Sequence, residues 1–303
     1  MVEPPYGIIA EKLSEGNVIP FLGAGASQVG RTEDAKWDPK KPKFLPNGRE
    51  LSHFLARKSS FPSAEQRDLD DLAKVSSYYA IISGRSSLSK QLQDVLSPDF
   101  TLGPLHQYLA SVSTPLLIVT TNYDSLIEQA FQAAGKPYDL VIHLSDRDDI
   151  ANAIYWWKHG ESEPIVEAPN NLDPELLRQR TVIYKMHGTV KRGDPEWDTF
   201  VITEEDYIDF LSRMTTKSAI PPIFSNHFRT RSFLFLGYSL ADWNFRVILK
   251  NLDSNLRSGR QDIPSWAIQR EPSELEKILW DKRNVKIFNM SHDEFAAKMQ
   301  QVS

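Results

Sequence analysis

The sequence Asn17-Val18-Ile19-Pro20-Phe21-Leu22-Gly23-Ala24-Gly25-Ala26-Ser27 decides the fold. Its first half, residues 17–22, is almost continuously apolar, which is the pattern of a strand buried on both faces of a sheet. A glycine turn follows this strand at once. Glycines there let the backbone approach a ligand closely, and Ser27 can donate a hydrogen bond to a phosphate. A tight strand-to-helix turn without a ligand explains the same residues equally well.

Apolar runs of strand length recur along the chain and alternate with helical patterns. Besides residues 17–22, we expect strands at residues 116–120, 139–144, 182–186, 199–203, 232–236, 265–269 and 285–288. We expect helices at residues 8–15, 51–58, 69–83, 87–96, 106–112, 124–134, 204–212 and 242–252, and further helices between and after the last two strands. This alternation predicts an α/β fold: a doubly wound, Rossmann-like, mostly parallel sheet with helices on both faces.

We expect one domain over residues 1–303, because no internal repeat or low-complexity tract divides the chain. Two stretches depart from the alternation of strands and helices. The first, about residues 50–112, reads as a helical insertion. The second, about residues 145–180, contains Pro164, Pro169 and Pro174 and is expected to form a surface insertion.

The composition excludes several kinds of site. The chain has 40 acidic and 35 basic residues and a net charge of −5, which argues against direct nucleic-acid binding through a basic face. It has no cysteine, so disulfides, thiolate zinc sites and a cysteine nucleophile are impossible. The sequence lacks a signal-peptide pattern and an apolar run of membrane-spanning length. We therefore expect a soluble, cytoplasmic protein that does not contact a membrane.

Two of the later strands lead directly into polar side chains. Residues 116–120 lead into Thr121-Asn122-Tyr123-Asp124, and residues 182–186 lead into His187-Gly188. Ligands of parallel sheets bind at the carboxyl ends of the strands, and a histidine there is suited to general-base chemistry near neutral pH. The structural alternatives are a helix N-cap for Asp124 and an ordinary histidine at a strand end for His187.

Two more short motifs need weighing. Residues 232–236 lead into Gly237-Tyr238-Ser239-Leu240, another small polar turn before an expected helix. A second histidine-glycine pair, His159-Gly160, follows no clean buried strand. We therefore favour His187 as the functional histidine.

In this order, the motifs resemble those of the sirtuin-like (silent-information-regulator-like) NAD-binding family. Residues 23–27 look like the family's GAGxS phosphate-binding turn, and residues 120–124 look like its TQNxD segment. His187-Gly188 looks like its catalytic HG, and residues 237–240 look like its GTSL. The resemblance covers most of residues 17–249 and implies that the chain binds NAD.

Departures from the family pattern narrow the resemblance. Deacylating sirtuins carry a four-cysteine zinc module, which this chain lacks, so we expect neither a zinc lobe nor zinc. Residues 139–180 separate the asparagine from the histidine, and Arg31 and Arg49 match the family's arginine segment poorly. The pattern is more similar to the sirtuin-like domains of bacterial antiviral defence systems, which hydrolyse NAD to nicotinamide and ADP-ribose.

The resemblance implies catalytic roles for Asn122 and His187. Asn122 would hold a water or the ribose near the anomeric carbon, and His187 would act as the general base. Asp124 would receive the carboxamide of nicotinamide. The implied NAD-binding residues are Gly23, Ala24, Gly25, Ser27, Thr121, Asp124, Gly237 and Ser239.

The resemblance also implies an NAD glycohydrolase that depletes NAD in defence. Control would come from homo-oligomerisation or from a partner such as a hexameric DNA-translocase-type ATPase. Two alternatives stay open: a sensor or scaffold subunit that binds NAD or ADP-ribose without turnover, and an NAD-dependent protein deacylase. The aromatic cluster Tyr155-Trp156-Trp157 is explained as an interface anchor, as a cover over the pocket or as a small local core.

Overall fold

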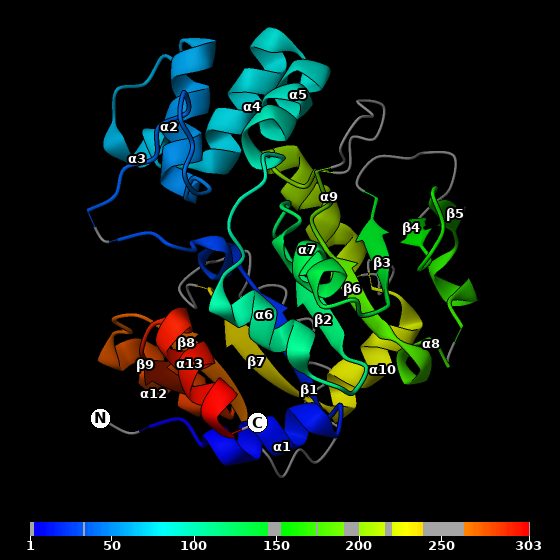
Figure 1. The fold of residues 1–303 in the computed structure, drawn as a ribbon. Coiled ribbons are helices and arrows are strands. Elements are labelled where there is room, and N and C mark those ends of the chain that lie inside the picture. Colours follow the sequence, from blue (N-terminus) through cyan, green and yellow to red (C-terminus); the bar gives the residue numbers. More distant parts are fainter. Residues whose placement is uncertain are drawn as a thin grey trace.

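The computed structural model describes residues 3–32, 34–144, 153–173, 175–190, 200–215, 220–238 and 264–302. In these residues one sheet has the strand order β5-β4-β3-β6-β2-β1-β7-β8-β9 (Figure 1). The strands are β1 Val18–Leu22, β2 Leu117–Thr120, β3 Tyr138–His143, β4 Ile154–Trp157, β5 Ile165–Glu167, β6 Thr181–Lys185, β7 Ser232–Leu236, β8 Ser265–Gln269 and β9 Val285–Asn289.

In the spatial order of the sheet, all strands from β3 to β9 pair in parallel. The last two strands at the other edge, β4 and β5, each pair antiparallel to their neighbour. β1 pairs in parallel with β2 on one side and with β7 on the other. The chain therefore builds the sheet outward from β1 in two directions, which is the doubly wound arrangement. The predicted fold class is confirmed, and the point where the strand order reverses lies at β1.

Helices cover both faces of the sheet because the buried strands are apolar on both sides. In β1, Val18 and Leu22 face one core, whereas Ile19 and Phe21 face the other. The first core is closed by α1 Tyr6–Ser14, α6 Pro104–Ser111, α7 Leu126–Ala133 and α13 His292–Val302. The second is closed by α8 Leu176–Gln179, α9 Glu204–Thr215, α10 Pro222–Thr230 and α12 Glu274–Asp281.

A third core belongs to a helical module at one end of the molecule (Figure 1). The module consists of α2 Gly48–Ser59, α3 Gln66–Leu69, α4 Leu72–Ser83 and α5 Arg85–Leu96. It packs on Leu126 and Val190, which follow β2 and β6. The helical module therefore lies over the carboxyl ends of these strands. The last expected helix of the 50–112 insertion, α6, instead packs on the sheet.

Asn47 and Glu50 fix the start of the helical module. The Asn47 side chain accepts a hydrogen bond from the Glu50 backbone N–H, and the Glu50 carboxylate accepts one from the Asn47 backbone N–H. This reciprocal capping box sets where α2 begins. None of the described helices is both long and apolar enough to cross a bilayer.

Two parts of the chain differ from expectation, and a third lies outside the described residues. The strand expected at residues 199–203 is wrong: residues 200–203 form an irregular segment in which Phe200 and Ile202 fill the module core. The expected 145–180 surface insertion contains β4 and β5, which extend the sheet. Tyr155 and Trp156 are buried in β4, as the local-core interpretation of the aromatic cluster requires. The helix expected at 242–252 lies outside the described residues.

Candidate active site

A cavity of about 540 Å³ lies between the strand ends and the helical module. Its roof comes from the first turns of α2 and α4, including Leu51 and Leu72. Its floor contains seven of the residues predicted from the sequence: Ala24, Ser27, Thr121, Asn122, Asp124, His187 and Gly237. The fold therefore brings together the loops that follow β1, β2, β6 and β7. Ser239 lies outside the described residues.

The glycines of the first and last motifs let two turns pack backbone to backbone. The Gly25 N–H donates to the Gly237 carbonyl oxygen at 2.9 Å, and Gly237 has a φ of +78°. A Cβ on Gly237 would lie 2.0 Å from the Ala26 nitrogen, and one on Gly23 would lie 2.7 Å from the Gly237 oxygen. This close approach requires glycine at these positions whether or not a ligand binds. A tight turn without a ligand was the alternative explanation of residues 23–27.

The turn after β1 is short. Ala24–Ser27 forms one four-residue 3-10 turn. Of this turn, Ala24 and Ser27 face the main cavity, and Gly25 borders a second cavity on its other side. The turn therefore separates two neighbouring hollows at the strand ends.

Asn122 is held by the glycine turn. Its side-chain nitrogen donates to the Gly23 carbonyl oxygen at 2.9 Å and to the Ser27 hydroxyl at 2.9 Å. Its backbone N–H donates to the Thr120 hydroxyl at 3.0 Å. These contacts orient the amide, and its oxygen receives no hydrogen bond from the described residues. That oxygen is available to a ligand or a water.

Asp124 has a structural role, although it is not the helix N-cap expected as an alternative, because Ser125 occupies that position in α7. One carboxylate oxygen accepts from the Leu126 N–H at 3.0 Å, at the start of α7, and the other accepts from the Ser27 hydroxyl at 2.8 Å. Asn122, Ser27 and Asp124 thus form a continuous chain of hydrogen bonds. A ligand that contacts Asp124 must use the remaining lone pairs of these oxygens.

His187 is one of the residues that line the cavity, and it lies in the loop after β6. It is 6% exposed, and its Nε2 has no hydrogen-bond partner among the described residues. The rings of Tyr207 and Phe210 meet it edge-on at centroid distances of 5.5 and 5.1 Å. Burial, with a smaller contribution from His143, lowers the pKa of His187 to about 3. The imidazole is therefore neutral at physiological pH.

His159 occupies a different part of the molecule. It follows β4, a mostly buried strand, so the sequence-based statement that no such strand precedes it is wrong. β3 and β6 are parallel, whereas β4 runs antiparallel to β3. The carboxyl end of β4 therefore lies at the end of the sheet opposite to the strand ends that carry His187. His159 lines a separate cavity beside α7 and β3. Because β4 is antiparallel, His159 does not lie in the candidate site.

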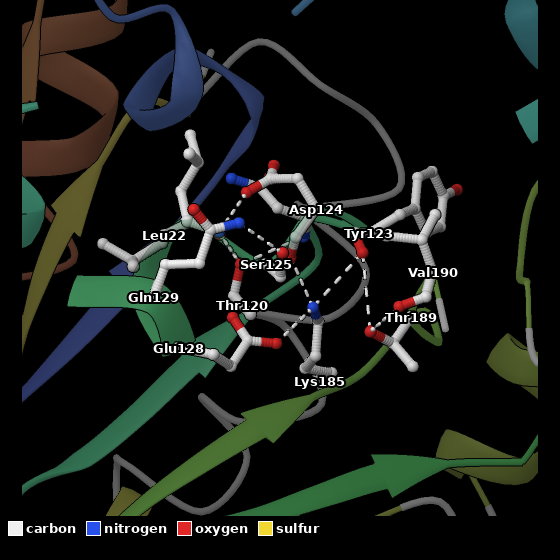
Figure 2. Close-up of polar contacts among 12 residues, drawn as sticks. Leu22, Thr120, Tyr123, Asp124, Ser125, Glu128, Gln129, Lys185, Thr189 and Val190 are labelled. Carbon is white, nitrogen blue, oxygen red and sulfur yellow. Dashed lines mark hydrogen bonds and ion pairs between the residues drawn. The ribbon is translucent and has the colours of Figure 1, made fainter. Parts of the chain in front are cut away.

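Lys185, which the sequence analysis did not single out, anchors the loop after β2. Figure 2 shows its ammonium group between Glu128 and the loop backbone. It donates to Glu128 Oε1 at 2.8 Å and to the carbonyl oxygens of Tyr123 and Asp124 at 3.2 and 2.5 Å. A lysine inside an otherwise apolar strand was the available sequence signal, because lysine is seldom fully buried without partners.

The two neighbouring cavities differ in charge. The described lining of the main cavity contains Asp70, Asp71 and Asp124 but neither lysine nor arginine. The second cavity, of about 490 Å³, is lined by Arg31 and Arg270 together with one carboxylate, Asp293. Arg31 is paired with Glu50 at 2.5 Å. In the described residues, no group of three or more His, Cys, Asp or Glu side chains is placed to hold a metal ion.

Sequence comparison identifies the family. A model of the SIR2-like domain matches residues 116–288. The chain belongs to the SIR2-like family. The matched region of this SIR2-like chain contains Asn122, His187 and Gly237.

Curated relatives of this SIR2-like chain include a defense-associated sirtuin and NAD(+) hydrolases. It is 22% identical to defense-associated sirtuin 2 of Bacillus subtilis over 93% of its own length and 24% of the relative's. It is 27% identical to the NAD(+) hydrolase ThsA of Acinetobacter baumannii over 80% of its length and 41% of the relative's. For ThsA of Enterococcus faecium the values are 27%, 86% and 45%. The chain thus spans less than half of each relative.

Proposed function

We propose that this chain hydrolyses NAD at the bond between nicotinamide and ribose, giving nicotinamide and ADP-ribose. One observation carries the proposal: Asn122, whose amide is oriented, and His187, whose buried Nε2 has no partner among the described residues, line the same cavity. The cavity lies where the strand order reverses, which is the usual ligand site of doubly wound sheets. The relatives named NAD(+) hydrolase support the choice of substrate.

The charges of the two cavities favour one orientation of the dinucleotide. The nicotinamide ring of NAD carries a positive charge, which suits the main cavity with its three aspartates. The pyrophosphate is anionic, so it would cross the glycine turn towards Arg270 in the second cavity. Contacts to the pyrophosphate and the adjacent ribose are proposed for Gly23, Ala24, Gly25, Ser27, Gly237 and Ser239, and contacts near nicotinamide for Thr121 and Asp124.

The proposed reaction needs no acid. When the bond from the ribose carbon to the ring nitrogen breaks, the electron pair goes to nicotinamide, which leaves as a neutral molecule. Positive charge then develops on the ribose, as in other glycoside hydrolyses. The Asn122 oxygen orients a water towards the ribose carbon. The His187 imidazole accepts the proton of that water as the new bond to oxygen forms.

We further propose that the activity serves antiviral defence by depleting NAD. The names of the relatives motivate this role. Unrestrained NAD hydrolysis would harm the host cell, so control through oligomerisation or a defence partner, such as a hexameric DNA-translocase-type ATPase, is part of the proposal.

A second candidate function is binding of NAD or ADP-ribose without turnover. It is favoured by the pKa of His187, about 3, because a general base so far below neutral pH is weak. It is also favoured by Asp124, whose two oxygens already accept hydrogen bonds within the protein.

Product analysis separates the candidates. Hydrolysis predicts equal amounts of nicotinamide and ADP-ribose from NAD alone. A binding subunit would retain NAD and release neither product. A deacylase would release nicotinamide only with an acylated peptide and would transfer the acyl group to the ribose. Incubation with NAD, with and without an acetyl-lysine peptide, therefore distinguishes all three.

A further inference from the structure

Lys185 is fully buried, and three acceptors surround its ammonium group. The acceptors are Glu128 Oε1 and the carbonyl oxygens of Tyr123 and Asp124 (Figure 2). An ammonium group has three N–H donors, so these contacts use its hydrogen-bonding capacity completely. Lys185 does not line the main cavity. Any influence on the reaction must therefore act through the residues that it holds.

The two carbonyl acceptors belong to the loop that presents the proposed catalytic asparagine. Asn122 directly precedes Tyr123 in the sequence. The Tyr123 carbonyl oxygen also accepts from the Val190 N–H at 2.9 Å. Lys185 is the last residue of β6, two positions before His187. The lysine thus ties the loop that carries Asn122 to the strand that carries His187.

Stability alone does not account for a buried ion pair at this point. Removing two charges from water is costly, and apolar residues of similar volume often replace buried pairs without loss of stability. An apolar side chain cannot, however, donate to the two loop carbonyls. What a cation with several donors adds here is a simultaneous hydrogen bond to the carbonyl oxygens of Tyr123 and Asp124.

We propose that Lys185 is a positioning residue that sets the distance and angle between Asn122 and His187, with Glu128 as its counter-ion. The proposal rests on the proposed hydrolysis of NAD. Glu128 lies in the first turn of α7 and is itself buried. Its charge offsets that of the lysine, whereas the lysine, not Glu128, donates to the two loop carbonyls.

Two variants separate positioning from ion pairing. Glu128→Gln keeps an oxygen acceptor for Lys185 and leaves the loop contacts intact, so kcat should stay close to wild type. Lys185→Met combined with Glu128→Leu removes both charges together and should fold, with a Tm lowered by the loss of the donor to the Asp124 carbonyl. Because it lacks the loop contacts, its kcat should fall about 10²-fold with little change in KM. Lys286→Met, at a surface pair with Asp281, is the control for loss of a lysine.

Hydrogen exchange of residues 121–126 gives a readout that does not depend on turnover. The double variant should exchange these amides faster than wild type, and Glu128→Gln should not. A double variant with wild-type kcat and unchanged exchange would overturn the positioning role. If wild type releases no nicotinamide, the proposed hydrolysis fails, and the exchange rates still decide whether Lys185 anchors the loop.

Discussion

The side-chain nitrogen of Asn122 lies 2.9 Å from the hydroxyl oxygen of Ser27, and that hydroxyl donates in turn to Asp124 at 2.8 Å. Ser27 comes from the turn after β1, whereas the other two residues come from the loop after β2. The amide is therefore oriented before any ligand arrives. Groups fixed in advance lose less entropy and reorganise less during a reaction, which is how positioned residues accelerate it.

Ser27→Ala should disturb both neighbours of this hydroxyl. It leaves the Asn122 nitrogen with one acceptor and one oxygen of Asp124 without its donor. We expect a loss of about 1–3 kcal/mol in the free energy of unfolding, measured by urea denaturation, and a lower kcat for nicotinamide release. Ser14→Ala, at an exposed hydroxyl that donates to Glu11, is the control. Equal kcat in both variants would contradict the role given to Ser27.

The two histidine-glycine pairs provide a matched test of the catalytic base. His187→Ala should reduce kcat by about 10²–10⁴-fold, the usual effect of removing a positioned general base. His159→Ala should leave kcat unchanged, because His159 lines a different cavity. Steady-state nicotinamide release measures both. Similar losses in the two variants would mean that the wrong histidine has been assigned.

Gly237 and Gly135 both have positive φ but differ in their surroundings. A Cβ on Gly237 would meet the Ala26 nitrogen at 2.0 Å, whereas one on Gly135 would meet nothing within 4 Å. Gly135→Ala should therefore cost only the left-handed backbone penalty of about 1–2 kcal/mol. Gly237→Ala should cost about 2–5 kcal/mol, because overpacking of about 1–3 kcal/mol adds to that penalty. Urea denaturation of both variants measures the difference, and equal losses would refute the close packing of the two turns.

The lowered pKa of His187 predicts a pH-dependent stability. Its folded pKa is about 3 because of burial, and its unfolded pKa is about 6.5. Between these values the unfolded state binds more protons, so the free energy of unfolding falls as pH falls from about 6.5. His187→Gln removes this contribution. Its slope between pH 6 and pH 4 should be shallower by about 1 kcal/mol per pH unit.

Two other buried histidines provide the control for this prediction. His143 and His292 also have pKa values lowered to about 4 by burial, so the His187→Gln protein should keep a residual slope. Urea denaturation across the pH range gives both slopes. Identical slopes in wild type and His187→Gln would show that His187 is solvated rather than buried.

Arg270 tests the proposed orientation of NAD. It is exposed, lies just after β8 and lines the second cavity. Arg270→Ala should raise KM for NAD about 10-fold or more with little change in kcat, because a charge-assisted contact to phosphate contributes about 1.5–3 kcal/mol to binding. Arg283→Ala, which removes a side chain packed over Trp280, is the control. An unchanged KM in Arg270→Ala would place the pyrophosphate elsewhere.

Buried strands and the polar residues at their ends were predictable from the sequence. Residues 18–22 and 181–185 are buried along their whole length, and such strands have continuous apolar runs that stand out. The apolar triplet Phe200-Val201-Ile202 looked similar, but it does not form a strand: Phe200 and Ile202 pack in the module core, and Val201 packs in a core of the sheet. Burial alone cannot separate these cases, because both require apolar side chains.

The contacts that build the site were beyond the sequence pattern. Ser27 and Asp124 are 97 residues apart, and nothing in the local sequence indicates that Ser27 donates a hydrogen bond to Asp124. The direction of β4 likewise depends on its pairing with β3. That direction places His159 at the end of the strands opposite to the candidate site. Pattern reasoning locates strand ends; the order and direction of the strands decide which ends meet.

The most direct test of the proposed activity is nicotinamide release from NAD by the purified wild-type protein, alone and with the product of its neighbouring gene, beside Asn122→Ala. Both proteins are also titrated with NAD by calorimetry. We predict release by wild type in at least one condition, with equimolar ADP-ribose, and loss of release in an Asn122→Ala protein that remains folded. Binding of NAD without release in either condition would contradict the hydrolase assignment and favour a binding subunit.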